Sequence, residues 1–226
     1  MSVGSGATRH AVFMVLGCGL LILGAASSQP SSPVDKGLPA LPASAVQDLL
    51  RQGELVLVAR QADGTLREVT AGVLVDAPVD RVWQTITDFE HYPSFMPQNT
   101  EAKVLDGSPA GTVRVQQTVA MRVWRLPAIE VHYTLAHRLD PPTRVSFWQV
   151  DGELPGTRGR WELVAAGPRT LCFYTTYTDL TQLGWGLGSM FRDEPEFMTG
   201  VTITTAMMVA RATRDEVQRR VRAPQR

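Results

Sequence analysis

Residues 75–97 have the sequence VDAPVDRVWQTITDFEHYPSFMP, which decides most of the fold. Pro78 follows an apolar run and is well placed to start a helix, because proline fits the first positions of a helix. The spacing predicts a helix over Val79–Phe89. Pro93 and Pro97 then interrupt the chain, which is compatible with a second, short helix between them. The apolar residues that share one side of the first helix are Val82, Trp83, Ile86 and Phe89.

The residues before this stretch predict a hairpin and a short helix. Glu54–Arg60 and Leu66–Val75 are apolar and flank Asp63-Gly64, a strong hairpin signal. Upstream, Ser44 is a plausible cap for a helix over Ala45–Leu50 that ends near Gly53.

The residues after this stretch alternate between apolar and polar side chains, which is typical of strands with one buried face. Asp140-Pro141-Pro142 and Gly167-Pro168 supply turns between them. Together with the hairpin, the pattern predicts about seven strands in a strongly bent antiparallel sheet. The apolar residues of shared parity are Val113, Val115, Val119, Met121 and Val123, then Val131, Tyr133 and Leu135, then Val145 and Phe147, then Trp161 and Leu163, then Leu171 and Phe173.

The last element changes to a helical period. Pro195 can start a helix that continues to about Arg222. Arginines gather at its far end, which suits the C-terminus of a helix dipole and favours a solvated helix end over a patch for anionic lipid. The predicted apolar face is Phe197, Val201, Thr205, Met208, Ala212 and Val217.

This order of elements is that of the α+β helix-grip fold, in which a bent sheet wraps round a long C-terminal helix. The opening residues Val75-Asp76-Ala77-Pro78 and Tyr92-Pro93, with the later Gly159-Arg160-Trp161-Glu162-Leu163, sharpen the comparison. From Glu54 to Val221 the chain resembles the START-like (SRPBCC) superfamily, in particular its coenzyme Q-binding and polyketide cyclase/dehydrase branch. The hairpin before Val75 would then add an extra N-terminal strand.

The resemblance implies an apolar cavity between the sheet and the long helix, for a lipid, quinone, sterol or isoprenoid. The inward parity places on its wall Val115, Val119, Met121, Val131, Tyr133, Phe147, Trp161 and Phe173, faced by Phe197, Val201, Thr205 and Met208. Each of these side chains could instead be ordinary core.

Uncharged polar residues and histidines share that parity and could orient one polar end of a ligand: Gln117, Tyr133, His137, Gln149, Thr175 and Tyr177. Some members of the superfamily cyclise or dehydrate polyketides, and Tyr133 with His137 is the pair that could do acid-base work. No metal-binding or nucleophile motif is found, so we expect no metal, cofactor or catalytic residue.

The segment 183–191 combines three glycines with large apolar side chains. It could be a lid or a transient membrane contact that uses Trp185, Leu187, Met190 and Phe191, or a loop packed over the mouth of the core.

The first residues resemble an export signal. Arg9 and His10 precede an uncharged apolar run, so residues 1–28 are predicted to be a signal peptide. A membrane anchor, or a lipoprotein acylated at Cys18, is the alternative. Residues 29–43 would form a Pro/Ser-rich linker, 44–222 the domain and 223–226 a tail. With Cys18 removed, Cys172 is alone and is interpreted as a packing residue.

Charge and composition narrow the function. Lys plus Arg and Asp plus Glu are 22 each, so nucleic-acid binding lacks its main driving force. We therefore expect a periplasmic or cell-surface binder of a hydrophobic small molecule that is not an enzyme. The alternatives are a cyclase or dehydratase, and an interaction module for an unknown protein partner that uses outward-facing Trp124 and Trp148, although a cover of N-terminal residues over them is favoured.

Overall fold

A computed structural model describes residues 43–107, 111–121, 129–184 and 186–223. All of them belong to one of the two compact units of the chain, residues 32–226. The predicted signal peptide, most of the linker, Trp124 and Trp185 lie outside the described residues, as do the side chains of Met121 and Leu187.

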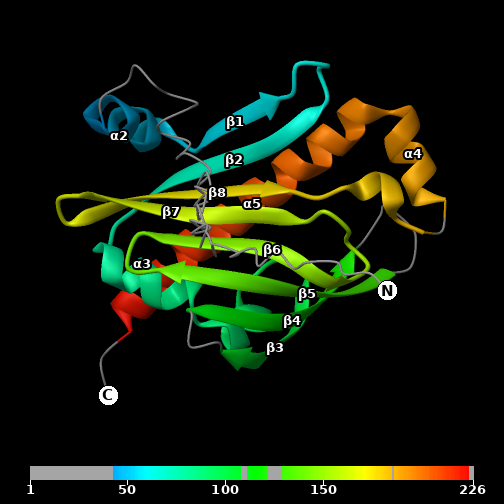
Figure 1. Ribbon diagram of the computed structural model, residues 1–226. Helices are drawn as coiled ribbons and strands as arrows, with labels where there is room; N and C mark the ends of the chain where they lie inside the picture. The colour runs from blue at the N-terminus through cyan, green and yellow to red at the C-terminus, as the bar shows by residue number, and fades with distance from the viewer. Residues whose placement is uncertain (1–42, 108–110, 122–128, 185, 224–226) are drawn as a thin grey trace, which may run out of the picture. The chain divides into compact units, whose positions relative to one another are not determined.

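The described strands form one antiparallel sheet in the order β1-β2-β8-β7-β6-β5-β4-β3. The long helix α5 lies against one face of this sheet (Figure 1). We call this the inner face. The strands are β1 (Leu55–Arg60), β2 (Leu66–Val75), β3 (Asn99–Gly107), β4 (Thr112–Met121), β5 (Ile129–Asp140), β6 (Arg144–Gly152), β7 (Arg158–Ala166) and β8 (Arg169–Tyr177).

The helices follow in chain order around the sheet. They are α2 (Ala43–Gln52), α3 (Val79–Ile86), the 3-10 helices η1 (Phe89–Ser94) and η2 (Leu180–Gln182), α4 (Leu187–Asp193) and α5 (Pro195–Arg222). None of these described helices combines the length and apolar character needed to cross a bilayer.

The predicted hairpin, the bent antiparallel sheet and the long last helix are confirmed. At the hairpin turn, Gly64 has a φ of +84°, a backbone conformation that side chains disfavour. Asp63 Oδ1 accepts hydrogen bonds from the backbone nitrogen and the hydroxyl of Thr65, which closes the turn.

Three sequence-based expectations need correction. The sheet has an eighth strand, β3, which was missed because it is an edge strand with mostly exposed, partly charged residues and weak alternation. The helix predicted over Val79–Phe89 ends at Ile86, and Phe89 begins η1. Ser44 lies inside α2, which begins at Ala43, so it is not the cap of that helix.

The outer face of the sheet is also partly apolar, because α2 covers it. Val46 and Leu50 of α2 pack with Leu171 and Phe173 of β8 in a small core of their own. The main core lies between the inner face, α3, η1 and α5. Apolar burial on both faces of β8 is the reason that alternation alone misleads about which residues of this strand face inward.

Candidate functional site

A cavity of about 180 Å³ lies between the inner face of the sheet and α5. Strands β4 to β8 supply most of the wall, and the corner that joins η1 to β3 closes one end. The helix contributes Val201, Thr202, Thr205 and Val209. This volume slightly exceeds the ~150 Å³ apolar cavity known to take up benzene.

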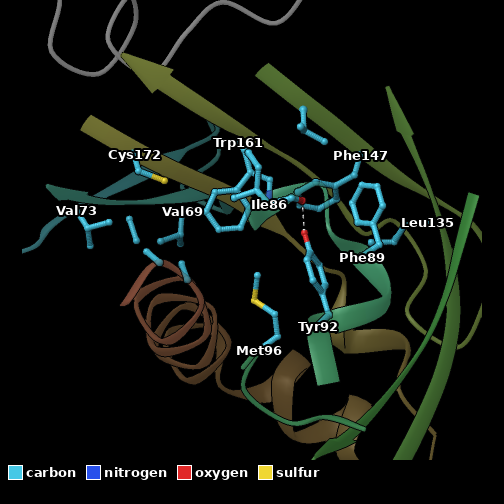
Figure 2. Packing of buried hydrophobic residues seen from close by; sticks show 14 of the residues in the cluster. Val69, Val73, Ile86, Phe89, Tyr92, Met96, Leu135, Phe147, Trp161 and Cys172 are labelled. Atoms are coloured by element: carbon cyan, nitrogen blue, oxygen red, sulfur yellow. Dashed lines mark hydrogen bonds between the residues drawn. The ribbon is translucent and has the colours of Figure 1, made fainter. Parts of the chain in front are cut away.

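Aromatic rings form the centre of the sheet side of this wall. Tyr174 of β8 lies 4.5 Å from Trp161 of β7 and stacks on Phe147 of β6 at 5.8 Å, both between ring centroids. Figure 2 shows Phe147 and Trp161 in the same layer of the core as Phe89 and Tyr92. The arrangement gives the cavity a flat apolar surface that suits planar or alicyclic ligands.

Glycine allows this layer to form. A Cβ on Gly159 would lie 2.2 Å from the carbonyl oxygen of Thr175 and 2.4 Å from Cζ of Phe147. Next to it, Trp161 points inward, whereas Arg160 and Glu162 point to the outer face and form an ion pair of 3.1 Å. The Gly-Arg-Trp-Glu segment is therefore a local device that brings two strands and two rings close together.

A polar cluster lies at the η1–β3 end of the cavity. Nδ2 of Asn99 donates to Oε1 of Gln117 at 2.9 Å, and the hydroxyl of Tyr133 donates to the same oxygen at 3.4 Å. All three residues line the cavity. Oδ1 of Asn99 is buried and has no hydrogen-bond partner among the described residues.

His137 of β5 lines another part of the wall. Its ring lies 4.5 Å from that of Phe89 and 5.9 Å from that of Phe147. Burial lowers its pKa to about 4, although backbone hydrogen bonding at Val113 and Leu135 opposes the shift. The imidazole is therefore neutral at neutral pH, and its buried Nδ1 has no partner within the described chain.

The tyrosines of the cavity are held in their neutral form. Burial raises the pKa of Tyr133 and of Tyr92, and it raises that of Tyr174 to about 12. The hydroxyl of Tyr92 donates to the carbonyl of Ile86 at 2.6 Å, the dashed line in Figure 2. Tyr92 thus ties η1 to the end of α3.

Of the predicted wall residues, Val119, Tyr133, Phe147, Trp161, Val201 and Thr205 line the cavity. Val115 and Val131 are fully buried in the main core without being part of the lining. Whether any of these residues contacts a ligand stays a prediction.

The placement of Phe173, Phe197 and Met208 on the wall is wrong. Phe173 faces outward and packs under α2. Phe197 and Met208 are 45% and 37% exposed. The buried side of α5 is rotated by one residue from the predicted side.

Small residues and threonines form the buried side of α5. Ala206 and Ala210 have no exposed surface and let the helix approach the sheet. The hydroxyl of Thr202 donates to the carbonyl of Met198 at 2.9 Å, and this bond within the helix allows a polar residue to be buried. A hydrophobicity pattern favours large apolar residues and therefore misses such a surface.

The polar residues predicted to face inward divide in the same way. Gln117, Tyr133 and His137 line the cavity. Gln149 instead donates to the backbone carbonyl of Gly152 at 2.8 Å. Thr175 shares a hydrogen bond of 2.8 Å with Thr70, and Tyr177 lies under the guanidinium of Arg158.

Segment 183–191 contains the end of η2 and part of α4. Phe191 is buried in the main core and stacks on Phe197 with 5.4 Å between the ring centroids, and Met190 is half-buried. Phe191 is therefore a packing residue, which corrects its assignment to a lid or membrane contact. Membrane contact by the rest of the segment stays a prediction.

Two further expectations concern the surface. Trp148 is 40% exposed, so the predicted cover over it is wrong for this residue. The basic end of α5 is largely paired, because Arg211 and Arg214 bind Glu54 and Arg220 binds Asp88. These pairs agree with a solvated helix end.

Sequence reasoning missed Asn99, Tyr174 and Thr202 as wall residues. Asn99 opens the missed strand β3, and Tyr174 was assigned to the outward parity of β8. Only the inward register of Gln117 and Tyr133, which pair across β4 and β5, pointed to this end of the cavity.

Cys172 is a fully buried, free thiol whose pKa burial raises to about 12. This agrees with its interpretation as a packing residue. Among the described residues, no group of three or more His, Cys, Asp and Glu side chains is arranged to hold a metal ion.

Three solved structures illustrate the fold. The Zhui aromatase/cyclase from Streptomyces sp. R1128 is 23% identical, with a TM-score of 0.56 over 70% of this chain and 96% of that one. A STAR-related lipid transfer protein from Xanthomonas axonopodis is 15% identical, with a TM-score of 0.56 over 74% and 94%. A START superfamily protein from Mycobacterium smegmatis is 18% identical, with a TM-score of 0.51 over 67% and 97%.

The fold and the cavity thus define a START-like (SRPBCC) domain of the kind that binds hydrophobic ligands. The family model described as polyketide cyclase/dehydrase and lipid transport matches residues 75–219, and the chain belongs to this family. The comparison with curated proteins finds no match. Binding of coenzyme Q, as the branch named from the sequence implies, stays a prediction.

Proposed function

We propose that the protein binds a small hydrophobic molecule in the cavity between α5 and the inner face of the sheet, and that it holds or transports this molecule without converting it. The observation that carries the proposal is the enclosed aromatic wall of Phe147, Trp161 and Tyr174 facing α5 across about 180 Å³ of free space. Well-packed cores contain few voids larger than a water molecule, so a space of this size is a feature in itself. Membership of a family that includes lipid transport supports the proposal.

The size of the cavity limits the ligand. Sites for drug-sized ligands usually measure ~300–1,000 Å³, and this cavity is smaller. It accommodates a group of one or two fused rings. A molecule as large as a sterol would enter only if α5 moved away from the sheet.

The polar residues of the cavity favour binding over acid-base catalysis. A general acid or base works best when its pKa lies near the working pH. The pKa of His137 is about 4 and that of Tyr133 is raised, so neither group exchanges protons readily at neutral pH. A bound substrate would have to reverse both shifts before this pair could act.

The second candidate is a cyclase or dehydratase, favoured by the uncharged hydrogen-bonding groups that project into an apolar cavity. It predicts turnover of a polyketide-like substrate that is lost in Tyr133→Phe and His137→Gln while ligand binding persists. Binding without turnover in the unchanged protein favours the carrier.

Equilibrium binding of naphthalene, followed by its fluorescence, tests the carrier proposal. Val201→Trp fills the cavity from α5 and should weaken naphthalene binding at least tenfold. Met208→Trp is the matched control, because Met208 lies on the exposed side of the same helix. It should leave the affinity within about twofold. Equal affinities for the unchanged protein and Val201→Trp would place naphthalene outside the cavity and contradict the proposal.

We also propose that the domain works outside the cytoplasm, after export directed by residues 1–28. The apolar run after Arg9 and His10 supports this. Fractionation of cells that express the full chain, with N-terminal sequencing of the recovered protein, tests it. A soluble cytoplasmic product that retains Met1 would contradict export.

A further inference from the structure

The wall of the cavity is polar in places but carries no full charge. Among the described residues that line it, none is Asp, Glu, Lys or Arg. Its titratable groups are His137 and tyrosines, and burial keeps the former neutral above pH about 4 and raises the pKa of the latter. An anionic headgroup would therefore lose its hydration without gaining a cationic partner, which is strongly unfavourable.

Asn99 offers the cavity one unused acceptor. Its side chain is 92% buried, since only 8% of its surface is exposed, and Oδ1 makes no hydrogen bond to any described residue. Its Nδ2 is already committed to Oε1 of Gln117. That oxygen also accepts from the hydroxyl of Tyr133, which fixes the orientation of both amides.

A buried acceptor without a donor is destabilising by about 1–3 kcal/mol, so natural proteins rarely leave one without a partner. The corner between η1 and β3 holds Asn99 in place, because the carbonyl of the preceding residue, Gln98, accepts a hydrogen bond from the backbone nitrogen of Ala120 at 2.8 Å. Its oxygen faces a site where a ligand can supply the donor. A carboxylate or an ether offers only lone pairs there, whereas a hydroxyl group donates.

From this geometry we propose that the ligand is an electrically neutral molecule with an apolar body of one or two rings and a hydroxyl group that donates a hydrogen bond to Oδ1 of Asn99. The inference rests on the proposed function, because it presupposes that the cavity binds a ligand. It deepens that function by naming the chemical class: phenols and cyclic alcohols rather than fatty acids, phospholipids or plain hydrocarbons.

Four probes of similar size test the proposal at pH 7 on the unchanged protein: naphthalene, 2-naphthol, 2-methoxynaphthalene and 2-naphthoate. We expect 2-naphthol to bind about five- to tenfold more tightly than 2-methoxynaphthalene, which cannot donate, because one hydrogen bond contributes about 1 kcal/mol. We expect 2-naphthoate to bind more weakly than both. Equal affinity for 2-naphthol and its methyl ether, or preference for the anion, would overturn the inference.

Two variants locate the preference. Asn99→Leu should reduce the ratio of the two affinities to about one. Thr202→Val is the control, because the hydroxyl of Thr202 also lies at the wall but already donates to Met198. It should keep the ratio. A ratio unchanged in folded Asn99→Leu would contradict the assignment to Asn99, and if that variant does not fold, the ratio in the unchanged protein still decides the ligand class.

The probe series also separates this inference from the function on which it rests. Binding of naphthalene without preference for 2-naphthol would leave the carrier intact and refute the hydroxyl group. Failure of all four probes to bind would refute both.

Discussion

Trp161 of β7 and Phe173 of β8 lie on neighbouring strands but face opposite sides of the sheet. The residue opposite Trp161 in the register is Tyr174, whose ring lies 4.5 Å away inside the cavity. Phe173 pairs with Glu162 and packs under α2 on the outer face. One residue along β8 therefore separates the ligand cavity from a purely structural core.

This relationship predicts different effects of two similar substitutions. Trp161→Leu and Phe173→Leu should each lower the free energy of unfolding by about 1–3 kcal/mol, because both remove buried aromatic surface. Only Trp161→Leu should change the affinity for naphthalene. Denaturant titration and probe binding on both variants check this, and a binding defect in Phe173→Leu equal to that of Trp161→Leu would contradict the assignment of the two faces.

Two glycines predict opposite changes of stability. Gly159→Ala should lower the free energy of unfolding by at least about 2 kcal/mol, because its Cβ would collide with the Thr175 carbonyl and the Phe147 ring. Gly200→Ala in α5 should raise it by up to about 1 kcal/mol, because a Cβ there meets nothing and alanine favours the helix. Denaturant midpoints measure both, and a stable Gly159→Ala would show that the two strands can separate.

His137 predicts a loss of stability on mild acidification. Its pKa falls from 6.5 in the unfolded chain to about 4 in the folded protein, so the unfolded state binds more protons between these values. Stability is complete above pH 6.5 and decreases as the pH falls toward 4, by up to about 1.4 kcal/mol per pH unit.

The variant His137→Gln should flatten this dependence between pH 6.5 and 4.5. Below that window, paired carboxylates such as Glu54, whose pKa the Arg211 hydrogen bond lowers to about 2, also begin to lose their contribution. Unfolding free energies of both proteins across the window provide the measurement. The same slope in the variant would mean that another group titrates.

Gln98 predicts a gain of stability at the closed corner of the cavity. It has a φ of 62°, in the left-handed region that favours glycine, and its side chain is exposed. Gln98→Gly should therefore raise the free energy of unfolding by up to about 1 kcal/mol, and Gln98→Val should lower it. Thermal unfolding of both variants tests this, and an equal loss in both would show that the glutamine side chain itself holds the corner.

The hairpin, the bent antiparallel sheet and the full length of α5 could be predicted because turn residues, alternation and Pro195 are local signals. The side of each element that faces the cavity was harder. On β8 both faces are apolar because α2 covers the outer one, so Phe173 and Tyr174 were exchanged. On α5, alanines and hydrogen-bonded threonines occupy the buried side, and the large side chains of Phe197 and Met208 are exposed.

Asn99 was beyond the reach of periodicity for a different reason. It belongs to an edge strand whose pattern is weak, and its role depends on a cross-strand partner, Gln117, that is distant in sequence. Six of the predicted wall residues nevertheless line the cavity, because the central strands β4 to β7 have one apolar and one polar face.

Native mass spectrometry of the protein purified from an exporting host, followed by solvent extraction and identification of what is released, tests the central claim most directly. We predict one neutral, hydroxyl-bearing apolar molecule per chain, absent from Val201→Trp and retained by Met208→Trp. A protein that is empty on purification and that binds none of the naphthalene probes would contradict the account.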